Sequence, residues 1–539
     1  MKRREFLRQS GLAAGAFALR PGVGRALGSP ELPEDPSAES NLSFTTSDAA
    51  CRRVYQHALR ALAGNVAVLP SSARPVLIEG SSYRGVWLEC APQEGLAYSA
   101  IRPDLALNNH LIFFELQRDD GQIPCSIKTS EIGFGQIQMV VPIAATAWDL
   151  YRQTGSSELL ETAYQGGSRW DAWLRQYRDT RHTGLCEGFC TYDTGHDNSP
   201  RWAGLPNRCP DADARKCPAI ASLPRLCPDL SATVYGGRVA LARMARELGR
   251  GSEADRWLAD AEAIRSLILS RLYSAEDAAF YDVDAQGKFV RIRGDVISRV
   301  LGEHVVDQKL FATIYQRQMH NPAAFWAPYP FPSIALNDPA FVRPIPRNSW
   351  GGAAQALTAL RAPRWMEHYG KPAALARVMQ KWVEAIGHAS DFYQQMDPLT
   401  GAFTIDPGGY SPAALVLVDF TWRLAGVRQT ESSLEWNVRP PAPGVHSSFL
   451  LQLRGGGSAE IRYSGGHAEL LLNRRVLLRT SDTVRLVTDS EGKLKSAAGI
   501  SAGVQKVTLQ RSLLPLRERL PLRDRDVSFS IAPDESRMF

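Results

Sequence analysis

The run Cys190-Thr-Tyr-Asp-Thr-Gly-His-Asp-Asn-Ser-Pro-Arg-Trp202 gathers acidic, basic and aromatic side chains on a loop that a glycine and a proline make sharp. A carboxyl group beside an aromatic wall can have a raised pKa and act as a general acid, which makes Asp197 a candidate. Arg201 could bind hydroxyl or carboxylate groups, and Trp202 could stack on a sugar face. The same run is equally compatible with a structural Asx-turn in which Asp197 or the following asparagine caps the next element.

The sequence on both sides of this loop, from about residue 45 to residue 428, has a mostly helical pattern. Apolar residues recur at spacings of three and four, as expected for helices that pack on neighbours. The helices come in successive pairs, without the fixed period of about 30–45 residues that marks a helical solenoid. We therefore predict a mainly α fold in which 45–428 form an α/α toroid, an inner ring of helices wrapped by an outer one. The amphipathic segments are 52–62, 105–116, 141–154, 158–176, 230–248, 254–272, 308–319, 355–360, 373–386 and 412–424.

The pattern changes near residue 430. Short runs of alternating apolar and polar residues appear there, and glycine-rich turns separate them. This pattern is typical of antiparallel strands, and it predicts a small C-terminal β-sandwich over 429–510. Arginines are interspersed with acidic residues in 511–539, which we expect to be a solvated or loosely docked tail.

The first residues, Met1-Lys-Arg-Arg-Glu-Phe-Leu-Arg8, have the form of a twin-arginine export signal, and a short apolar run follows them. We expect the signal to occupy 1–28 and a linker rich in proline, glutamate and serine to occupy 29–44. Such a signal implies a periplasmic or extracellular protein. No stretch of about 18 apolar residues occurs, so no membrane-spanning helix is expected.

The charge balance argues against nucleic acid as a partner. The chain of 539 residues has a formal net charge of +6, but residues 1–28 hold six basic residues against one acidic residue. The remainder is therefore nearly neutral, whereas a nucleic-acid-binding body is usually basic. Hydrophobic residues make up 44% of the chain and charged residues 22%, which excludes a mainly disordered or fibrous protein.

Eight cysteines are present, and five of them lie between residues 186 and 227. An even count in an oxidising compartment permits disulfides. No C-x-x-C pair occurs, so we expect no zinc site, and no other metal or cofactor is indicated. A disulfide that staples a loop, for example Cys209 with Cys217, is the interpretation we favour. Buried free thiols are the alternative.

The run Gly195-His-Asp-Asn-Ser-Pro-Arg-Trp202 resembles the G-x-D-x-S-P-R-W signature of glycoside hydrolase family 63 and of mannosylglycerate-hydrolase-like (six-hairpin) enzymes, and more distantly a run in the family 37 trehalases. Other segments resemble motifs of these enzymes in the same order, over about residues 80–425. The resemblance implies an (α/α)6 toroid and an inverting glycosidase without a cofactor. The segments are Trp87-Leu-Glu89, Asp119-Asp-Gly-Gln-Ile-Pro124, Pro228-Asp-Leu-Ser231, Phe280-Tyr-Asp282, Asn348-Ser-Trp-Gly-Gly352 and Met396-Asp-Pro-Leu-Thr-Gly401.

The same resemblance implies catalytic roles. Asp197 matches the general acid, which in an inverting enzyme protonates the leaving oxygen while a second carboxylate about 6.5–9.5 Å away activates a water. The position of that base in the family falls on Gln394, whose amide can position a water but cannot take its proton. Asp397, Glu89 and Glu367 are the alternative bases, and the absence of any base is a further alternative.

Aromatic, amide and charged side chains of the matched segments and of the neighbouring loop 325–348 are the expected sugar-binding groups. Rings stack on sugar faces, while amides and guanidinium groups donate to hydroxyls. Each of these residues could instead belong to the core. The candidates are Trp87, Trp202, Trp326, Tyr329 and Trp350 for stacking, and Gln122, His196, Arg201 and Asn348 for hydrogen bonding.

These observations predict an exported glycoside hydrolase, inverting and exo-acting, with an oligosaccharide or a small glycoside as its partner. A phosphorylase on the same toroid is one alternative, because phosphate is its own nucleophile and needs no protein base. A non-catalytic glycan-binding protein is another, and Gln394 is the residue that suggests it. A polysaccharide lyase, which would eliminate with a Tyr/His pair, is the third.

Overall fold

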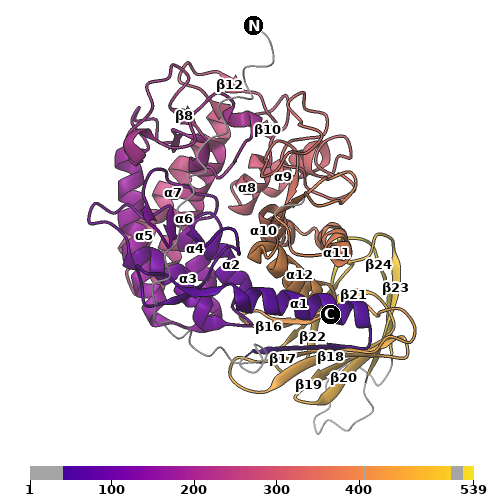
Figure 1. Ribbon diagram of the computed structural model, residues 1–539. Helices are drawn as coiled ribbons and strands as arrows, with labels where there is room; N and C mark the ends of the chain where they lie inside the picture. The colour runs from indigo at the N-terminus through magenta and orange to yellow at the C-terminus, as the bar shows by residue number, and fades with distance from the viewer. Residues whose placement is uncertain (1–39, 405–406, 512–525) are drawn as a thin grey trace, which may run out of the picture.

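The computed structural model describes residues 40–404, 407–511 and 526–539, with most of the helices in one part of the molecule and the two largest β-sheets in the other (Figure 1). The predicted export signal at 1–28 and most of the predicted linker at 29–44 lie outside the described residues. Across the part of the chain that is described, no helix combines the length and the apolar character that crossing a membrane requires.

Alternate helices of the chain contact one another in order and close into a ring, because α12 also contacts α2 (Figure 1). In four of these helices, α2, α6, α8 and α12, most residues are buried. The ring helices are α2 (Ala91–Tyr98), α4 (Ile143–Thr154), α6 (Pro228–Glu247), α8 (Val296–Gly302), α10 (Ala356–His368) and α12 (Ser411–Ala425).

A second set of helices packs against this ring. α3 contacts α2, α5 contacts α4, α7 contacts α6, and α11 contacts both α10 and α12. In α7 the buried residues are confined to Ala254, Ala261, Ile264 and Ile268, a stripe at helical spacing that explains its amphipathic sequence. The outer helices are α1 (Ala49–Gly64), α3 (Pro103–Glu115), α5 (Ser157–Tyr177), α7 (Gly251–Arg271), α9 (Gln308–Ile314) and α11 (Pro372–His388).

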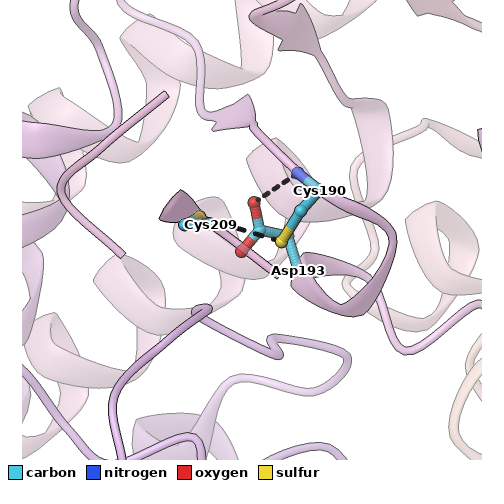
Figure 2. Close-up of side chains that lie close together, drawn as sticks. All are labelled: Cys190, Asp193 and Cys209. Carbon is cyan, nitrogen blue, oxygen red and sulfur yellow. Dashed lines mark hydrogen bonds between the residues drawn. The ribbon is translucent and has the colours of Figure 1, made fainter. Parts of the chain in front are cut away.

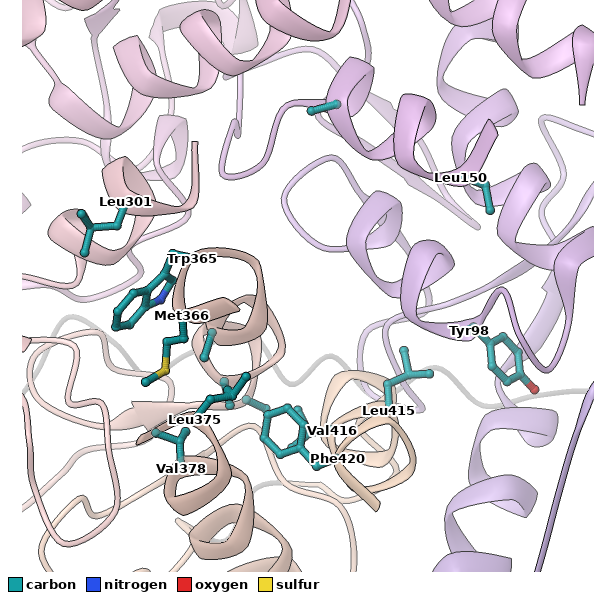
Figure 3. Close-up of a cluster of buried hydrophobic side chains, with 14 of the residues drawn as sticks. Tyr98, Leu150, Leu301, Trp365, Met366, Leu375, Val378, Leu415, Val416 and Phe420 are labelled. Carbon is teal, nitrogen blue, oxygen red and sulfur yellow. The ribbon is translucent and has the colours of Figure 1, made fainter. Parts of the chain in front are cut away.

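One hydrophobic core runs through the helices and into the sheets. Each fully buried aliphatic or aromatic side chain of this kind stabilises the fold by about 1.5–3 kcal/mol relative to an exposed one. Figure 3 shows part of this core, including Tyr98, Leu150, Leu301, Trp365, Met366, Leu375, Val378, Leu415, Val416 and Phe420.

The β region consists of two antiparallel sheets, and buried residues of both, such as Trp436 and Phe449, belong to the same core. One sheet has the order β1-β17-β18-β19-β20-β23-β24 and the other β15-β16-β21-β22-β25. The strands are β1 (Leu42–Thr46), β15 (Val427–Gln429), β16 (Ser433–Val438), β17 (Ser447–Gln452), β18 (Ser458–Ser464), β19 (His467–Leu472), β20 (Arg475–Thr480), β21 (Val484–Asp489), β22 (Leu494–Ala498), β23 (Gln505–Arg511), β24 (Val527–Ile531) and β25 (Ser536–Met538).

The structure corrects the two ends of the predicted β region. The expected tail at 511–539 contains β24, which pairs with β23, and β25, which pairs with β22, so its described part belongs to the sheets. Phe529 and Ile531 of β24 are buried, which explains why this segment packs rather than remaining solvated. At the other end, the last residues of the predicted linker begin β1, in which Phe44 lies opposite Phe449 of β17.

Candidate active site

Asp197 lies on a loop between two short 3-10 helices, Thr191–Asp193 and Pro200–Trp202. The backbone carbonyl of Asp197 accepts a hydrogen bond from the Trp350 amide at 2.9 Å, and its Oδ2 accepts one from Nδ2 of Asn348 at 3.1 Å. These contacts fix both the backbone and the carboxyl group of Asp197. The side chain nevertheless remains partly exposed to solvent.

Burial raises the pKa of Asp197 to about 6, and the hydrogen bond from Asn348 offsets part of that rise. A carboxyl group with such a pKa holds its proton into weakly acidic solution, where an unperturbed aspartic acid has lost it. It can therefore donate that proton to an oxygen in a reaction near pH 6.

Gln394 lies beside Asp197 in a chain of hydrogen bonds. Its Nε2 donates to Oδ1 of Asn348 at 3.1 Å, and its Oε1 accepts from the hydroxyl of Tyr83 at 3.1 Å. The pairing of β13 (Ala354–Gln355) with β14 (Gln395–Met396) brings this segment next to the loop. Both ends of the amide are thus engaged, and Gln394 positions Asn348 and Tyr83.

The carboxyl group of Glu89 packs directly against the Asp197 loop. Gly195 has φ +61°, and a Cβ atom on residue 195 would lie 1.8 Å from Oε2 of Glu89, so only glycine permits this approach. Burial raises the pKa of Glu89 well above its ordinary value, and the charges of Glu79 and Asp197 raise it further. Glu89 remains partly exposed, so the structure brings a second accessible carboxyl group to Asp197.

Two buried glutamates that sequence reasoning missed surround this pair. Glu79 accepts a hydrogen bond from the hydroxyl of Tyr410 at 2.9 Å, and burial and the charge of Glu94 raise its pKa to about 8. Burial likewise raises the pKa of Glu94 to about 8. Neither residue belongs to a motif. The sequence offered a signal for Glu94 only, which is an acidic residue among the small and apolar residues of α2, such as Leu96.

Arg201 does not face this site, which corrects the prediction that it binds sugar. Its guanidinium donates to both carboxylate oxygens of Asp229, each at 2.7 Å, and to Asp282 at 2.6 and 2.8 Å. A further bond of 2.8 Å joins it to Nδ1 of His196. All its donors are therefore used inside the protein, where it is 5% exposed.

His196 is also part of this internal network and not a substrate ligand. Its Nδ1 accepts from Arg201, so its Nε2 carries the proton and donates to Oδ1 of Asp295 at 2.7 Å. Burial lowers the pKa of His196 to about 4, which keeps the ring neutral. The network holds the backbone of the loop on which the next residue, Asp197, is presented.

Three further residues that were predicted to bind sugar are buried, so the prediction that they contact the substrate directly is wrong. Trp202 donates from Nε1 to Thr194 at 2.9 Å and is 2% exposed. Gln122 is fully buried and donates to the carbonyl of Phe134. Trp350 is 3% exposed and packs against the ring of His196. Their role is to support the loop segments.

Of the remaining aromatic candidates, Trp87 is partly exposed and its ring meets that of Tyr83 edge-on, next to Gln394. Trp326 is partly buried, and its ring packs against His320 and Phe331. The hydroxyl of Tyr329 donates to Glu384 on the outer helix α11. The structure therefore groups Trp87, but neither Trp326 nor Tyr329, with the site.

Two of the predicted bases are engaged in structural contacts. Oδ1 of Asp397 accepts the backbone amides of Leu399 and Thr400, and Oδ2 pairs with Arg343 at 3.1 Å, so Asp397 closes its own turn. Glu367 pairs with three arginines, one of which, Arg485, lies in strand β21. Glu367 thus joins helix α10 to the sheets.

Two clusters of cysteine and aspartate could in principle hold a metal: Cys190, Asp193 and Cys209, and Cys227, Asp229 and Asp282. In each cluster the carboxylates already pair with a buried guanidinium, Arg178 in the first and Arg201 in the second. These donor sets therefore do not fit a cation, because its charge would lie beside that of an arginine.

The comparisons with known proteins give the family of the chain. The family model for the mannosylglycerate hydrolase MGH1-like glycoside hydrolase domain matches residues 88–422, more than half of the chain. Among curated proteins no match was found.

Solved structures show a similar fold at low sequence identity. A family 63 mannosylglycerate hydrolase from Thermus thermophilus superposes with a TM-score of 0.57 at 18% identity, over 68% of this chain and 100% of that one. Neutral trehalase from Saccharomyces cerevisiae gives 0.52 at 12% identity, over 69% and 80%. A family 78 rhamnosidase from Bacillus sp. GL1 gives 0.54 at 12% identity, over 81% and 42%. The chain belongs to the mannosylglycerate hydrolase MGH1-like glycoside hydrolases and is a glycosidase.

Proposed function

We propose that this protein is an exported, inverting and exo-acting glycosidase built on an (α/α)6 toroid, with Asp197 as its general acid. The observation that carries the proposal is that two partly exposed carboxyl groups lie within electrostatic reach of each other: Asp197 on the loop, and Glu89, whose carboxyl packs against Gly195 of the same loop. The closed ring of α2, α4, α6, α8, α10 and α12 supports an exo mode of action, because a closed ring admits a chain end more readily than the middle of a polymer.

In the proposed reaction, Asp197 donates its proton to the glycosidic oxygen as the bond to the anomeric carbon breaks. A water attacks that carbon from the opposite face, and Glu89 takes the proton that the water loses. This step requires the form of the pair in which Asp197 holds the one proton and Glu89 is ionised, which the raised pKa of Glu89 makes the minor singly protonated form of the free enzyme. Asn348 steadies the carboxylate that Asp197 becomes, since it already donates to Oδ2. Gln394 holds Asn348 in place and takes no proton.

The substrate is proposed to be a small glycoside or the end of an oligosaccharide. A panel of α- and β-glycosides tests this, beginning with mannosides and glucosides because the structural neighbours include a mannosylglycerate hydrolase and a trehalase. Proton NMR of the first-formed sugar is expected to show the inverted anomer. A retained anomer would contradict the inverting mechanism, and no hydrolysis of any glycoside would contradict the proposed function.

Glu89→Gln is expected to lower kcat by about 10²–10⁴-fold, because the amide keeps the shape of the side chain but cannot accept the proton of water. Added azide should restore turnover in this variant and yield a glycosyl azide, since the small anion replaces the water and needs no base. Turnover and product are measured by NMR with and without azide.

Asp397→Asn is the matched control for this experiment. Because Asp397 closes a turn and pairs with Arg343, its variant should keep near-normal kcat and show no response to azide. If azide restored turnover in Glu79→Gln but not in Glu89→Gln, Glu79 and not Glu89 would be the base.

A further inference from the structure

Cys190 and Cys209 lie at opposite ends of the segment that carries Asp197, and their sulfur atoms are 3.8 Å apart (Figure 2). Both residues are buried together against Phe189. Backbone hydrogen bonds hold the two ends: the amide of Cys209 donates to Gly135, and the carbonyl of Cys190 accepts from Asp193. Two thiols so close need only small side-chain rotations to reach bonding distance, which for a disulfide is about 2.05 Å.

A metal ion is the competing use of this cluster, and the third member of the cluster argues against it. Both oxygens of Asp193 accept from Arg178, at 2.5 and 3.0 Å, and the amides of Ile137, Phe189 and Cys190 also donate to them. Arg178 is fully buried and its Nη2 lies 3.7 Å from Sγ of Cys209. A cation would therefore face a guanidinium and find no free carboxylate, whereas a neutral disulfide suits the position.

We propose that Cys190 and Cys209 form a disulfide that closes the loop carrying His196 and Asp197. The two thiols lose two protons and two electrons to a small-molecule or protein disulfide, which is reduced to its two thiols. Cys217 is partly exposed and packs against the pair, which gives the oxidant a path to the cluster. This pairing differs from the Cys209–Cys217 pair that the sequence suggested.

The disulfide would restrict the conformations of residues 190–209 in the unfolded chain. This restriction would stabilise the folded state of the loop that carries Asp197. Crosslinks that close loops of this length raise stability mainly by restricting the unfolded state. Oxidation should therefore raise Tm by at least about 2 °C. The inference concerns the covalent state of the loop and does not depend on which glycoside is cleaved.

The test uses the purified full chain, treated with oxidised glutathione or with a reductant, then denatured, alkylated and digested without reduction. Peptide mapping of the oxidised wild type is expected to show Cys190 linked to Cys209, with the loss of two hydrogens, and Tm should be higher than for the reduced protein. Cys209→Ser should remove both the link and the Tm difference. Cys125→Ser changes a buried cysteine outside the cluster and should keep both.

If Cys209→Ser fails to fold, peptide mapping of the oxidised wild type still tests the proposal. Cys217→Ala is a second variant, and it should still form the Cys190–Cys209 link. A Cys209–Cys217 link, or alkylation of both Cys190 and Cys209 after oxidation, would overturn the proposal. Neither readout uses catalysis, so a protein that forms the link but cleaves no glycoside would contradict only the proposed function.

Discussion

Asp197→Asn is expected to lower kcat on unactivated glycosides by about 10²–10⁴-fold and to leave binding nearly unchanged. The asparagine keeps the size of the side chain and can still face Asn348, but it has no proton to give to the leaving oxygen. The loss should be much smaller for a dinitrophenyl glycoside, because its leaving group departs without protonation. Steady-state kcat and KM on both kinds of substrate measure the difference.

Asp211→Asn is the matched control, because Asp211 is an exposed acid on the chain just after the loop and pairs with Lys216. It should keep wild-type turnover on both substrates. Equal losses on activated and unactivated substrates in Asp197→Asn would show that Asp197 does something other than protonate the leaving group. Unchanged turnover in Asp197→Asn would show that another residue is the general acid.

The pH profile supplies an independent test of the same residue. Burial raises the pKa of Asp197 to about 6, and Glu89, whose own pKa is raised, shares its surroundings. Activity needs one proton on this pair, so it should fall as the pH rises through about 6 or above and the last proton leaves. Asn348→Ala removes a hydrogen bond that favours the charged carboxylate, so the alkaline limb of kcat/KM should move to higher pH. An unmoved or downward-shifted limb would contradict this assignment.

The sequence predicted most of the outer and long helices but missed two ring helices, α2 and α8. The reason is physical: α8 is buried at every one of its residues and α2 at most of them, so neither has a polar face to create a periodic pattern. α10 was predicted to end at residue 360 but continues through Pro363 to His368. Proline there is tolerated because α8, α11 and α12 pack against this helix and hold it in place.

The loop motif located the site but could not assign its individual residues. Arg201, Trp202 and His196 are as well suited to a sugar as to a buried network, and the partners that bury them, Asp229 and Asp282 among them, lie far away in sequence. For the same reason Glu79 was missed, since only the fold brings it within electrostatic reach of Asp197. Composition thus predicts which functional groups the loop carries, whereas burial determines which of these side chains remain exposed and can contact a substrate.

Arg201→Met is expected to cost about 3–5 kcal/mol in the free energy of unfolding, the largest effect on stability that we predict. Met fills similar space, but it leaves the carboxylates of Asp229 and Asp282, both nearly fully buried, without their shared partner. Arg299, 3.4 Å from Asp229, compensates only in part. Denaturant unfolding of the wild type and the variant measures the difference. Arg215→Met removes an exposed pair with Asp213 and should cost no more than about 1 kcal/mol.

The dependence on pH separates lost charge pairing from lost packing. Burial alone would raise the pKa of Asp229, but Arg201 lowers it to about 2. A carboxyl group with a depressed folded-state pKa stabilises the fold above its unfolded pKa, and this stabilisation is lost as the pH falls towards 2. The difference between wild type and Arg201→Met should therefore be largest near neutral pH and narrow below about pH 4. A difference that stays constant with pH would mean that Arg201 acts through packing, and the network could not then be what holds His196 and the Asp197 loop in place.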